Sequence, residues 1–200
     1  QSLRAKKNFP ISGTQIHYEF IHSYLILKKA AAIANFKAKK MDSKKSQAII
    51  AAVDKIINTE LVKKNPENYF IVDAYQAGAG TSQNMNINEV IANVANEMHG
   101  LKLGSYTFIH PNDDVNMSQS TNDTYPTVMR LATLELSHHL LRELTLLSSI
   151  FDIKAQQFDH VIKSGRTHLQ DAVPIRLGQE FSAYKTTIDQ LSQLLTHAQY

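Results

Sequence analysis

The sequence predicts an all-α, mainly helical protein. Only 7 Gly and 5 Pro occur among its 200 residues, so long regular segments meet few residues that break a helix. Apolar residues recur at helical spacing in several long runs, the longest covering residues 122–158. With 43% apolar residues the chain can bury a real core. We therefore expect one helical domain joined to part of a second.

Three helices are predicted in the first half of the chain. The first runs from Gln15 to about Lys40, with an apolar stripe of Ile16, Phe20, Ile21, Tyr24, Leu27, Ala31 and Ala34. The second has Ser43 as its N-cap and ends before Pro66. Its stripe comprises Ile49, Ile50, Val53, Ile56, Ile57 and Leu61. A short extended segment (70–72) and a glycine-rich run (77–80) precede the third helix, which ends before Gly100 and carries Val90, Ile91, Val94 and Met98.

Longer helices are predicted in the second half of the chain. Residues 100–121 are polar and show no period, which is typical of an ordered loop kept for function. The run at 122–158 tolerates Pro126 in its first turns, and a helix of this length indicates a bundle. After a break at 163–174, a last stripe (Ile188, Leu191, Leu194, Leu195) reaches Tyr200 without a stop signal. We expect an amino-terminal helical domain, 1–118, and the first part of a truncated bundle, 119–200.

The amino-acid composition excludes several classes of protein. The chain has no cysteine, which excludes disulfides and thiolate metal sites and suits a reducing cytoplasm. We expect a cytoplasmic protein without membrane association, because no apolar run approaches about 20 residues and the first residues lack a signal-peptide core. Residues 1–64 hold 13 of the 21 Lys and Arg. Their pairing on helical segments (Lys28-Lys29, Lys39-Lys40, Lys63-Lys64) predicts a solvated basic face rather than a nucleic-acid site.

Three loops concentrate small hydroxyl and amide side chains, at 78–89, 110–127 and 163–181. In the first, glycines allow a ligand to approach the backbone, Thr81 and Ser82 offer hydroxyls, and the asparagines 84, 86 and 88 either cap the next helix or donate amides. In the second, Ser120, Thr121 and Asn122 precede a long helix, where unpaired N–H groups and the helix dipole favour an anion. Capping, shared with Asp123 and Thr124, is the alternative.

The third loop brings together Arg166, Thr167 and His168. His168 is a proton-transfer group, a substrate hydrogen-bond donor or a structural histidine. We expect no metal, because the nine histidines show no ligand spacing such as HExxH. We also expect no cofactor, since phosphate-loop and dinucleotide fingerprints are absent, and the GxSxG nucleophile pattern is absent as well. Residue chemistry alone predicts a site for a small carboxylate.

Three segments carry a resemblance to a known family: 81–93 (TSQNMNINEVIAN), 110–127 (HPNDDVNMSQSTNDTYPT) and 165–181 (GRTHLQDAVPIRLGQEF). In order and spacing they resemble the conserved regions of the aspartase/fumarase superfamily. The resemblance implies a bundle of that superfamily's type and a homotetramer whose active sites each take loops from three subunits. It also implies that a small dicarboxylate is held by Thr81, Ser82, Ser120, Thr121, Asn122 and Thr167, and that His168 contacts or orients it. His110, Asn112 and Asp113 resemble a loop that forms a second dicarboxylate site in fumarases.

Three shorter segments resemble one branch of the superfamily and so bear on which reaction the protein catalyses. The segments 8–13 (NFPISG), 75–82 (YQAGAGTS) and 120–122 (STN) look like those of aspartases, which implies anti-elimination of ammonia from L-aspartate to give fumarate. The alternatives are a class II fumarase and a non-catalytic carboxylate-binding helical module. Family enzymes take the proton with a serine on a mobile loop of pattern GSSxMPxKxNP. These 200 residues do not contain that loop, so we expect the chain by itself to be inactive.

Overall fold

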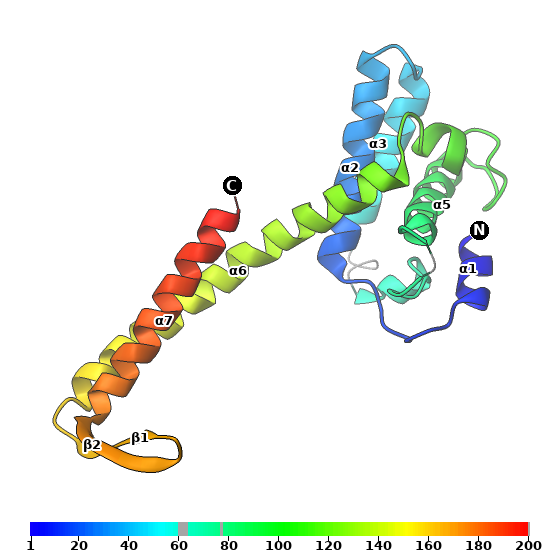
Figure 1. Cartoon of the computed structure of the whole chain (residues 1–200). Coiled ribbons are helices and arrows are strands. Elements are labelled where there is room, and N and C mark those ends of the chain that lie inside the picture. Colours follow the sequence, from blue (N-terminus) through cyan, green and yellow to red (C-terminus); the bar gives the residue numbers. More distant parts are fainter. Residues whose placement is uncertain (60–63, 77, 200) are drawn as a thin grey trace. The chain divides into compact units, whose positions relative to one another are not determined.

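The computed structural model describes residues 1–59, 64–76 and 78–199, and it confirms a mainly helical protein (Figure 1). The chain divides into two compact units, residues 1–132 and 133–200. The boundary that we expect at 118/119 lies at the start of the helix α6 (Thr121–Gln157), whereas the two units meet within this helix. The first turns of α6 belong to the first unit because Val128 is completely buried in its core.

The first unit is built on three helices that lie side by side, α2 (Tyr18–Lys37), α3 (Ser43–Asn58) and α5 (Thr81–Met98). Shorter elements surround them: α1 (Ser2–Asn8), the 3₁₀-helix η1 (Pro66–Asn68) and the π-helix η2 (Pro111–Val115). The fully buried side chains of the core come from every helix of the trio and include Ile21, Tyr24, Leu25, Ile49, Val53 and Ile91. The three predicted helices are thus confirmed.

A side-chain cap fixes the first residue of α3. The α3 N-cap is Asp42, whose carboxylate accepts the backbone N–H of Lys45 at 2.9 Å. The predicted cap, Ser43, is therefore wrong by one position: both residue types are good caps, but Asp42 has the extended backbone of a cap and Ser43 is already helical. The predicted continuation of this helix to Leu61 lies outside the described residues. The segment at 70–72 forms neither helix nor strand, but Phe70 and Val72 are buried.

One feature of the predicted basic face is wrong. Lys39 and Lys40 are exposed, but Lys28 is completely buried on the inner side of α2. Its neighbour Lys29 faces α3 and pairs with Asp54 at 2.6 Å. Lys63 lies outside the described residues. Helical periodicity could have shown that Lys28 shares the face of Tyr24 and Leu25, yet a lysine on such a face is rare.

The second unit is a helical pair with a hairpin at one end. Here α7 (Leu177–Ala198) returns alongside the later part of α6 (Figure 1). Phe181 packs on Phe151 and Phe158, and Ser148 donates to Asp189 at 2.5 Å. In the described part of the chain, no helix is both long enough and apolar enough to span a membrane.

The break predicted at 163–174 is a two-stranded antiparallel hairpin, β1 (Ile162–Thr167) and β2 (Gln170–Arg176). The sequence prediction contained no strand. His168 and Leu169 form the two-residue turn, and both have positive φ angles of 52° and 62°. A turn of this kind usually carries Asn-Gly, so the sequence lacked the ordinary hairpin signal.

Candidate active site

A glycine-rich loop leads directly into α5. Gly80 is the N-cap of this helix and has a left-handed conformation, φ 81°. A Cβ atom built on Gly80 would overlap the ring of Tyr125, which comes from α6. Only glycine therefore lets the loop and α6 approach this closely. The approach leaves Thr81 exposed as the first helical residue and Ser82 half-buried behind it.

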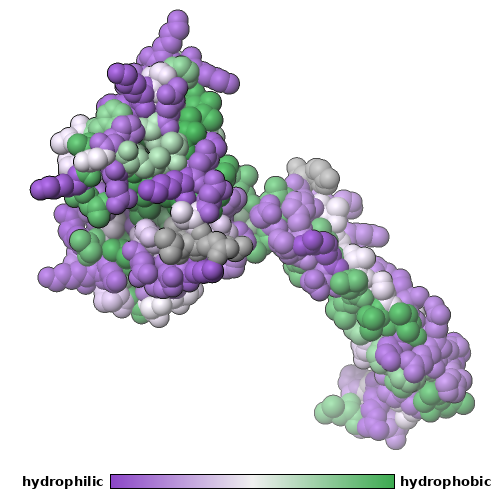
Figure 2. Space-filling view, turned by 180° about the vertical axis from the view of Figure 1, so that it is seen from behind, coloured by the Kyte–Doolittle hydropathy of each residue, from purple (hydrophilic) through white to green (hydrophobic). Residues whose placement is uncertain are grey.

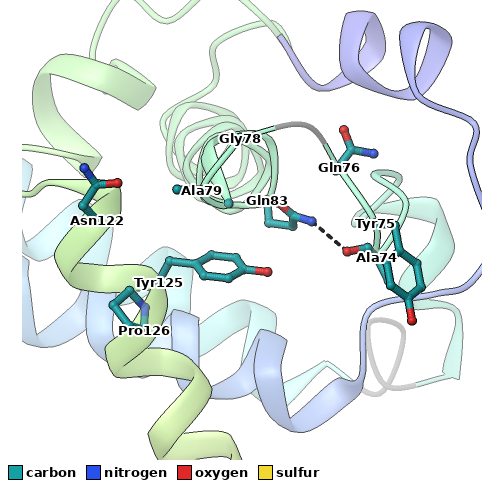
Figure 3. Close-up of a pocket in the computed structure, with 10 residues that line it drawn as sticks. Ala74, Tyr75, Gln76, Gly78, Ala79, Gln83, Asn122, Tyr125 and Pro126 are labelled. Atoms are coloured by element: carbon teal, nitrogen blue, oxygen red, sulfur yellow. Dashed lines mark hydrogen bonds between the residues drawn. The ribbon is translucent and has the colours of Figure 1, made fainter.

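The loop and the start of α6 line an open cavity of about 380 Å³ (Figure 3). Asn122 and Tyr125 face it from α6, opposite the segment that contains Tyr75 and Gln76. Among the described residues, the lining consists of Ala74, Tyr75, Gln76, Gly78, Ala79, Gly80, Gln83, Asn122, Tyr125 and Pro126. Of the predicted substrate residues, Asn122 is part of this lining.

Sequence reasoning missed Tyr125, Gln76 and Gln83 as cavity residues. Gln83 is buried, and its side-chain amide donates to the carbonyl oxygen of Ala74 at 3.1 Å (Figure 3). Tyr125 lies within the helix predicted at residues 122–158. Nothing in the sequence of a helix distinguishes an aromatic ring that lines a cavity from one that packs in the core. Gln83 carries a recoverable signal, since it is a polar residue on the same helical face as the apolar Ile87 and Val90.

Two amide oxygens of the lining, Oε1 of Gln76 and Oε1 of Gln83, are buried without a hydrogen-bond partner in the described part of the chain. A buried acceptor that stays unpaired costs about 1–3 kcal/mol. Burial also raises the pKa of the Tyr125 phenol, which keeps it protonated and able to donate. The lining thus offers both acceptors and donors to a polar ligand.

The predicted anion-binding residues do begin the long helix. Thr121 is the first residue of α6, and the Ser120 hydroxyl accepts the backbone N–H of Asn122 at 3.3 Å. Ser120 and Asn122 are exposed, while Thr121 is half-buried. The Nδ2 atom of Asn84 donates to the Thr121 hydroxyl at 3.0 Å, which ties this helix start to α5.

The structure decides one of the two roles left open for the asparagines of α5. Asn84, Asn86 and Asn88 are all buried inside the helix, and none is its N-cap. Asn86 donates to the carbonyl of Tyr69 at 3.0 Å, and Asn88 donates to Asn116 at 3.2 Å. The capping alternative is therefore wrong. The amides make hydrogen bonds within the protein, and their donation to a ligand stays a prediction.

The remaining predicted site residues lie in two further places. His110, Asn112 and Asp113 are adjacent around η2, where Asn112 donates to Asp113 at 3.3 Å and the His110 ring lies 3.2 Å from the Asp113 carboxylate. In the second unit Thr167 ends β1, and His168 forms the exposed turn with its positive φ. The structure thus groups Thr81, Ser82 and residues 120–122 within the first unit, and Thr167 with His168 in the second.

Comparison with known proteins assigns the chain to a family. A family described as "Lyase" matches residues 1–199. The chain belongs to this lyase family. Across 94% of its length it is 52% identical to aspartate ammonia-lyase of Bacillus subtilis, and across 99% it is 43% identical to class II fumarate hydratase of Bacillus anthracis. Both are members of the superfamily that the sequence motifs indicated.

Solved structures agree with this lyase fold. A fumarate lyase:delta crystallin from Brucella melitensis superposes with a TM-score of 0.84 at 46% identity, covering 97% of this chain and 45% of that one. A class II fumarase from Schistosoma mansoni gives 0.82 at 36% identity, covering 96% and 40%. The lyase chain spans 39% of the B. subtilis protein and 42% of the B. anthracis protein.

Proposed function

We propose that the protein to which this chain belongs is an aspartate ammonia-lyase. It would remove a proton from the carbon next to one carboxylate of L-aspartate and expel ammonia from the adjacent carbon, leaving fumarate. The observation that carries the proposal is the 52% identity to the B. subtilis aspartate ammonia-lyase over 94% of the chain. Class II fumarate hydratases of Bacillus cereus, Bacillus anthracis and Helicobacter pylori are 42%, 43% and 46% identical to the chain.

The residues of the first unit support a binding role in this reaction. The hydroxyls of Thr81, Ser82, Ser120 and Thr121 and the amide of Asn122 are neutral donors that would hold the substrate carboxylates. Residues 120–122 lie at the start of α6, and Thr81 and Ser82 lie at the start of α5, so each group adds the positive end of a helix dipole. Removal of the proton gathers negative charge on the neighbouring carboxylate, and donors already aimed at that charge would lower the barrier.

Two further observations bear on the proposal. The unpaired oxygens of Gln76 and Gln83 favour a ligand that brings N–H groups, as the ammonium of aspartate does. The cavity lining contains no carboxylate, imidazole or amine among its residues, so we assign these residues to binding and not to proton abstraction. His168 would contact or orient the substrate.

Assembly is part of the same proposal: we infer a homotetramer in which three subunits contribute to each active site. Within the second unit α6 and α7 leave large apolar side chains exposed, visible as green surface in Figure 2. They include Leu140, Leu146, Ile150, Ile153, Leu191 and Leu194. Contiguous exposed apolar surface commonly marks a protein interface, so this face supports association of subunits. The second dicarboxylate site at His110, Asn112 and Asp113 stays a prediction.

The test is fumarate formation by the full-length protein, followed by ultraviolet absorbance, with L-aspartate and L-malate supplied in parallel. We expect absorbance to rise with L-aspartate only. A rise with L-malate only would identify a class II fumarase, which the 46% identity to the fumarate hydratase of Helicobacter pylori keeps as the second candidate. Binding of a dicarboxylate without turnover of either substrate would indicate a non-catalytic module.

A further inference from the structure

A buried lysine lies behind the candidate carboxylate site. Lys28 has no exposed surface, although a lysine is almost never fully buried without a charged partner. Its Nζ atom donates to Oδ1 of Asn116 at 3.0 Å and to Oε1 of Gln119 at 2.9 Å. The ammonium also lies 5.5 Å from the ring centre of Tyr24. All three contacts are with neutral groups.

These contacts continue to the start of α6. The oxygen of Asn116 that accepts from Lys28 also accepts Nδ2 of Asn84 at 3.0 Å. The same Nδ2 atom of Asn84 donates to the Thr121 hydroxyl. Lys28 is therefore connected to Thr121 through two amide side chains, all within the first unit.

We propose that Lys28 is a positioning residue for the carboxylate site: it orders the Asn116–Asn84 chain that holds Thr121, and it places an uncompensated positive charge behind the start of α6. The proposal rests on the proposed dicarboxylate-binding function and deepens it. A charge in a low-dielectric interior acts more strongly than one in water. A bound dianion would supply the negative partner that the described surroundings of Lys28 lack.

The electrostatics of Lys28 support this role. Burial lowers its pKa to about 7. The buried or half-buried titratable groups on the elements around it include the phenols of Tyr24 and Tyr125, with pKa values raised by burial, and Asp114, which pairs with Lys45 at 2.7 Å. Asp113 on η2 and Asp123 on α6 are exposed. A dianion binds better to the protonated lysine, so the affinity for a dicarboxylate should increase as the pH falls from 8.5 to 6.5.

The experiment compares binding of succinate, a non-reacting dicarboxylate, to the full-length wild type and to K28M by titration calorimetry between pH 6.5 and 8.5. We expect K28M to weaken binding about ten-fold or more at pH 6.5, the scale of one lost charged hydrogen bond. We also expect its pH dependence over this range to be flatter than that of the wild type. A purely structural role would not change the pH profile.

The matched control is K29M, which removes the same charge one residue along α2 but faces Asp54 on α3. It should bind succinate within two-fold of the wild type. Should K28M not fold, as judged by circular dichroism, K28Q is measured in its place because its amide still donates without a charge. Succinate binding and a pH profile equal to the wild type in the folded variant would overturn the role of Lys28 alone. Failure of the wild type to bind any dicarboxylate would overturn the proposed function as well.

Discussion

At the scale of single residues, Gly78 and Gly80 share a conformation but not an environment. Their φ angles are 80° and 81°, and a Cβ on Gly78 would meet nothing within 4 Å. A Cβ on Gly80 would overlap the Tyr125 ring. The comparison between the two positions separates the cost of the backbone conformation from the cost of the contact.

We predict that G80A destabilises the full-length protein more than G78A. Both substitutions place a side chain in the left-handed region at a cost of about 1–2 kcal/mol. Only G80A must also displace Tyr125, and such overpacking adds about 1–3 kcal/mol. Denaturant unfolding measures the difference. Equal losses in the two variants would show that Tyr125 moves aside freely, and the cavity wall would then not depend on Gly80.

Asp73 is a second residue with a distinct electrostatic environment. Its carboxylate accepts the backbone N–H groups of Tyr75 at 2.8 Å, Ser12 at 2.8 Å and Gly13 at 2.7 Å, together with the Ser12 hydroxyl. The Tyr75 hydrogen bond, followed by those of Ser12 and Gly13, lowers the Asp73 pKa to about 2. The charged carboxylate thus links residues 12–13 to residues 73–75, which precede the glycine-rich loop.

We predict that D73N removes a pH-dependent part of the stability. Because the pKa of Asp73 is lower in the folded state, its contribution is present above pH 4 and is lost as the pH falls toward 2. The difference in thermal midpoint between wild type and D73N should therefore shrink over this range. E67Q removes a charge from an exposed residue nearby and should show no such trend. A D73N difference that stays constant from pH 5 to pH 2 would contradict this account.

At the scale of elements, the first and last residues of a helix can be predicted closely from the sequence where its apolar pattern is long. The run expected at 122–158 is α6 at Thr121–Gln157, and the third helix is α5 with its predicted end before Gly100. The hairpin β1–β2 was missed. Its turn residues, His168 and Leu169, are poor choices for a turn with two positive φ angles, so this element carries backbone strain.

We predict that L169G stabilises the hairpin by about 1 kcal/mol, because glycine adopts a positive φ without the steric penalty of a Cβ. L169A is the control, since it also removes the fully exposed leucine side chain but keeps the Cβ. Amide hydrogen exchange of β1 and β2 reports the change. Slower exchange in L169G than in L169A is expected. Faster exchange in both variants would show instead that the leucine side chain stabilises the turn through a contact with another subunit.

At the scale of the whole molecule, the proposed role of His168 depends on the proposed assembly. In the proposed tetramer the hairpin turn of one subunit would meet a carboxylate site to which other subunits contribute. We predict that H168A in the full-length protein lowers kcat by about 100-fold, the scale expected when a group that orients the substrate is lost. Light scattering should find the tetramer unchanged.

The matched variant is H160A, an exposed histidine of the same unit outside the hairpin. It should keep both turnover and assembly. Loss of the tetramer in H168A would mark His168 as a structural residue, and normal turnover in an intact tetramer would remove it from the active site altogether.

The sequence by itself determined the helical class, the limits of the long helices and the superfamily. The polar segments predicted as loops are only partly loops, since residues from Thr81 onward form α5 and residues 162–176 form the β1–β2 hairpin. Helical periodicity and motif order are local properties, so a single chain suffices to read them. The same local reading placed Thr121 and Asn122 at a helix start, where the structure has them. Roles of individual site residues, which depend on the assembled protein, stay predictions.

Only the tertiary structure decided which polar residues meet. Lys28 was expected in solvent and is buried against Asn116 and Gln119, some 90 residues away along the chain. Tyr125 faces the glycine-rich loop because Gly80 leaves room for its ring. Neither contact can be recognised from the periodicity of the sequence, because each depends on how α2, α5 and α6 pack against one another. Packing of distant segments therefore fixed the cavity wall and the burial of Lys28.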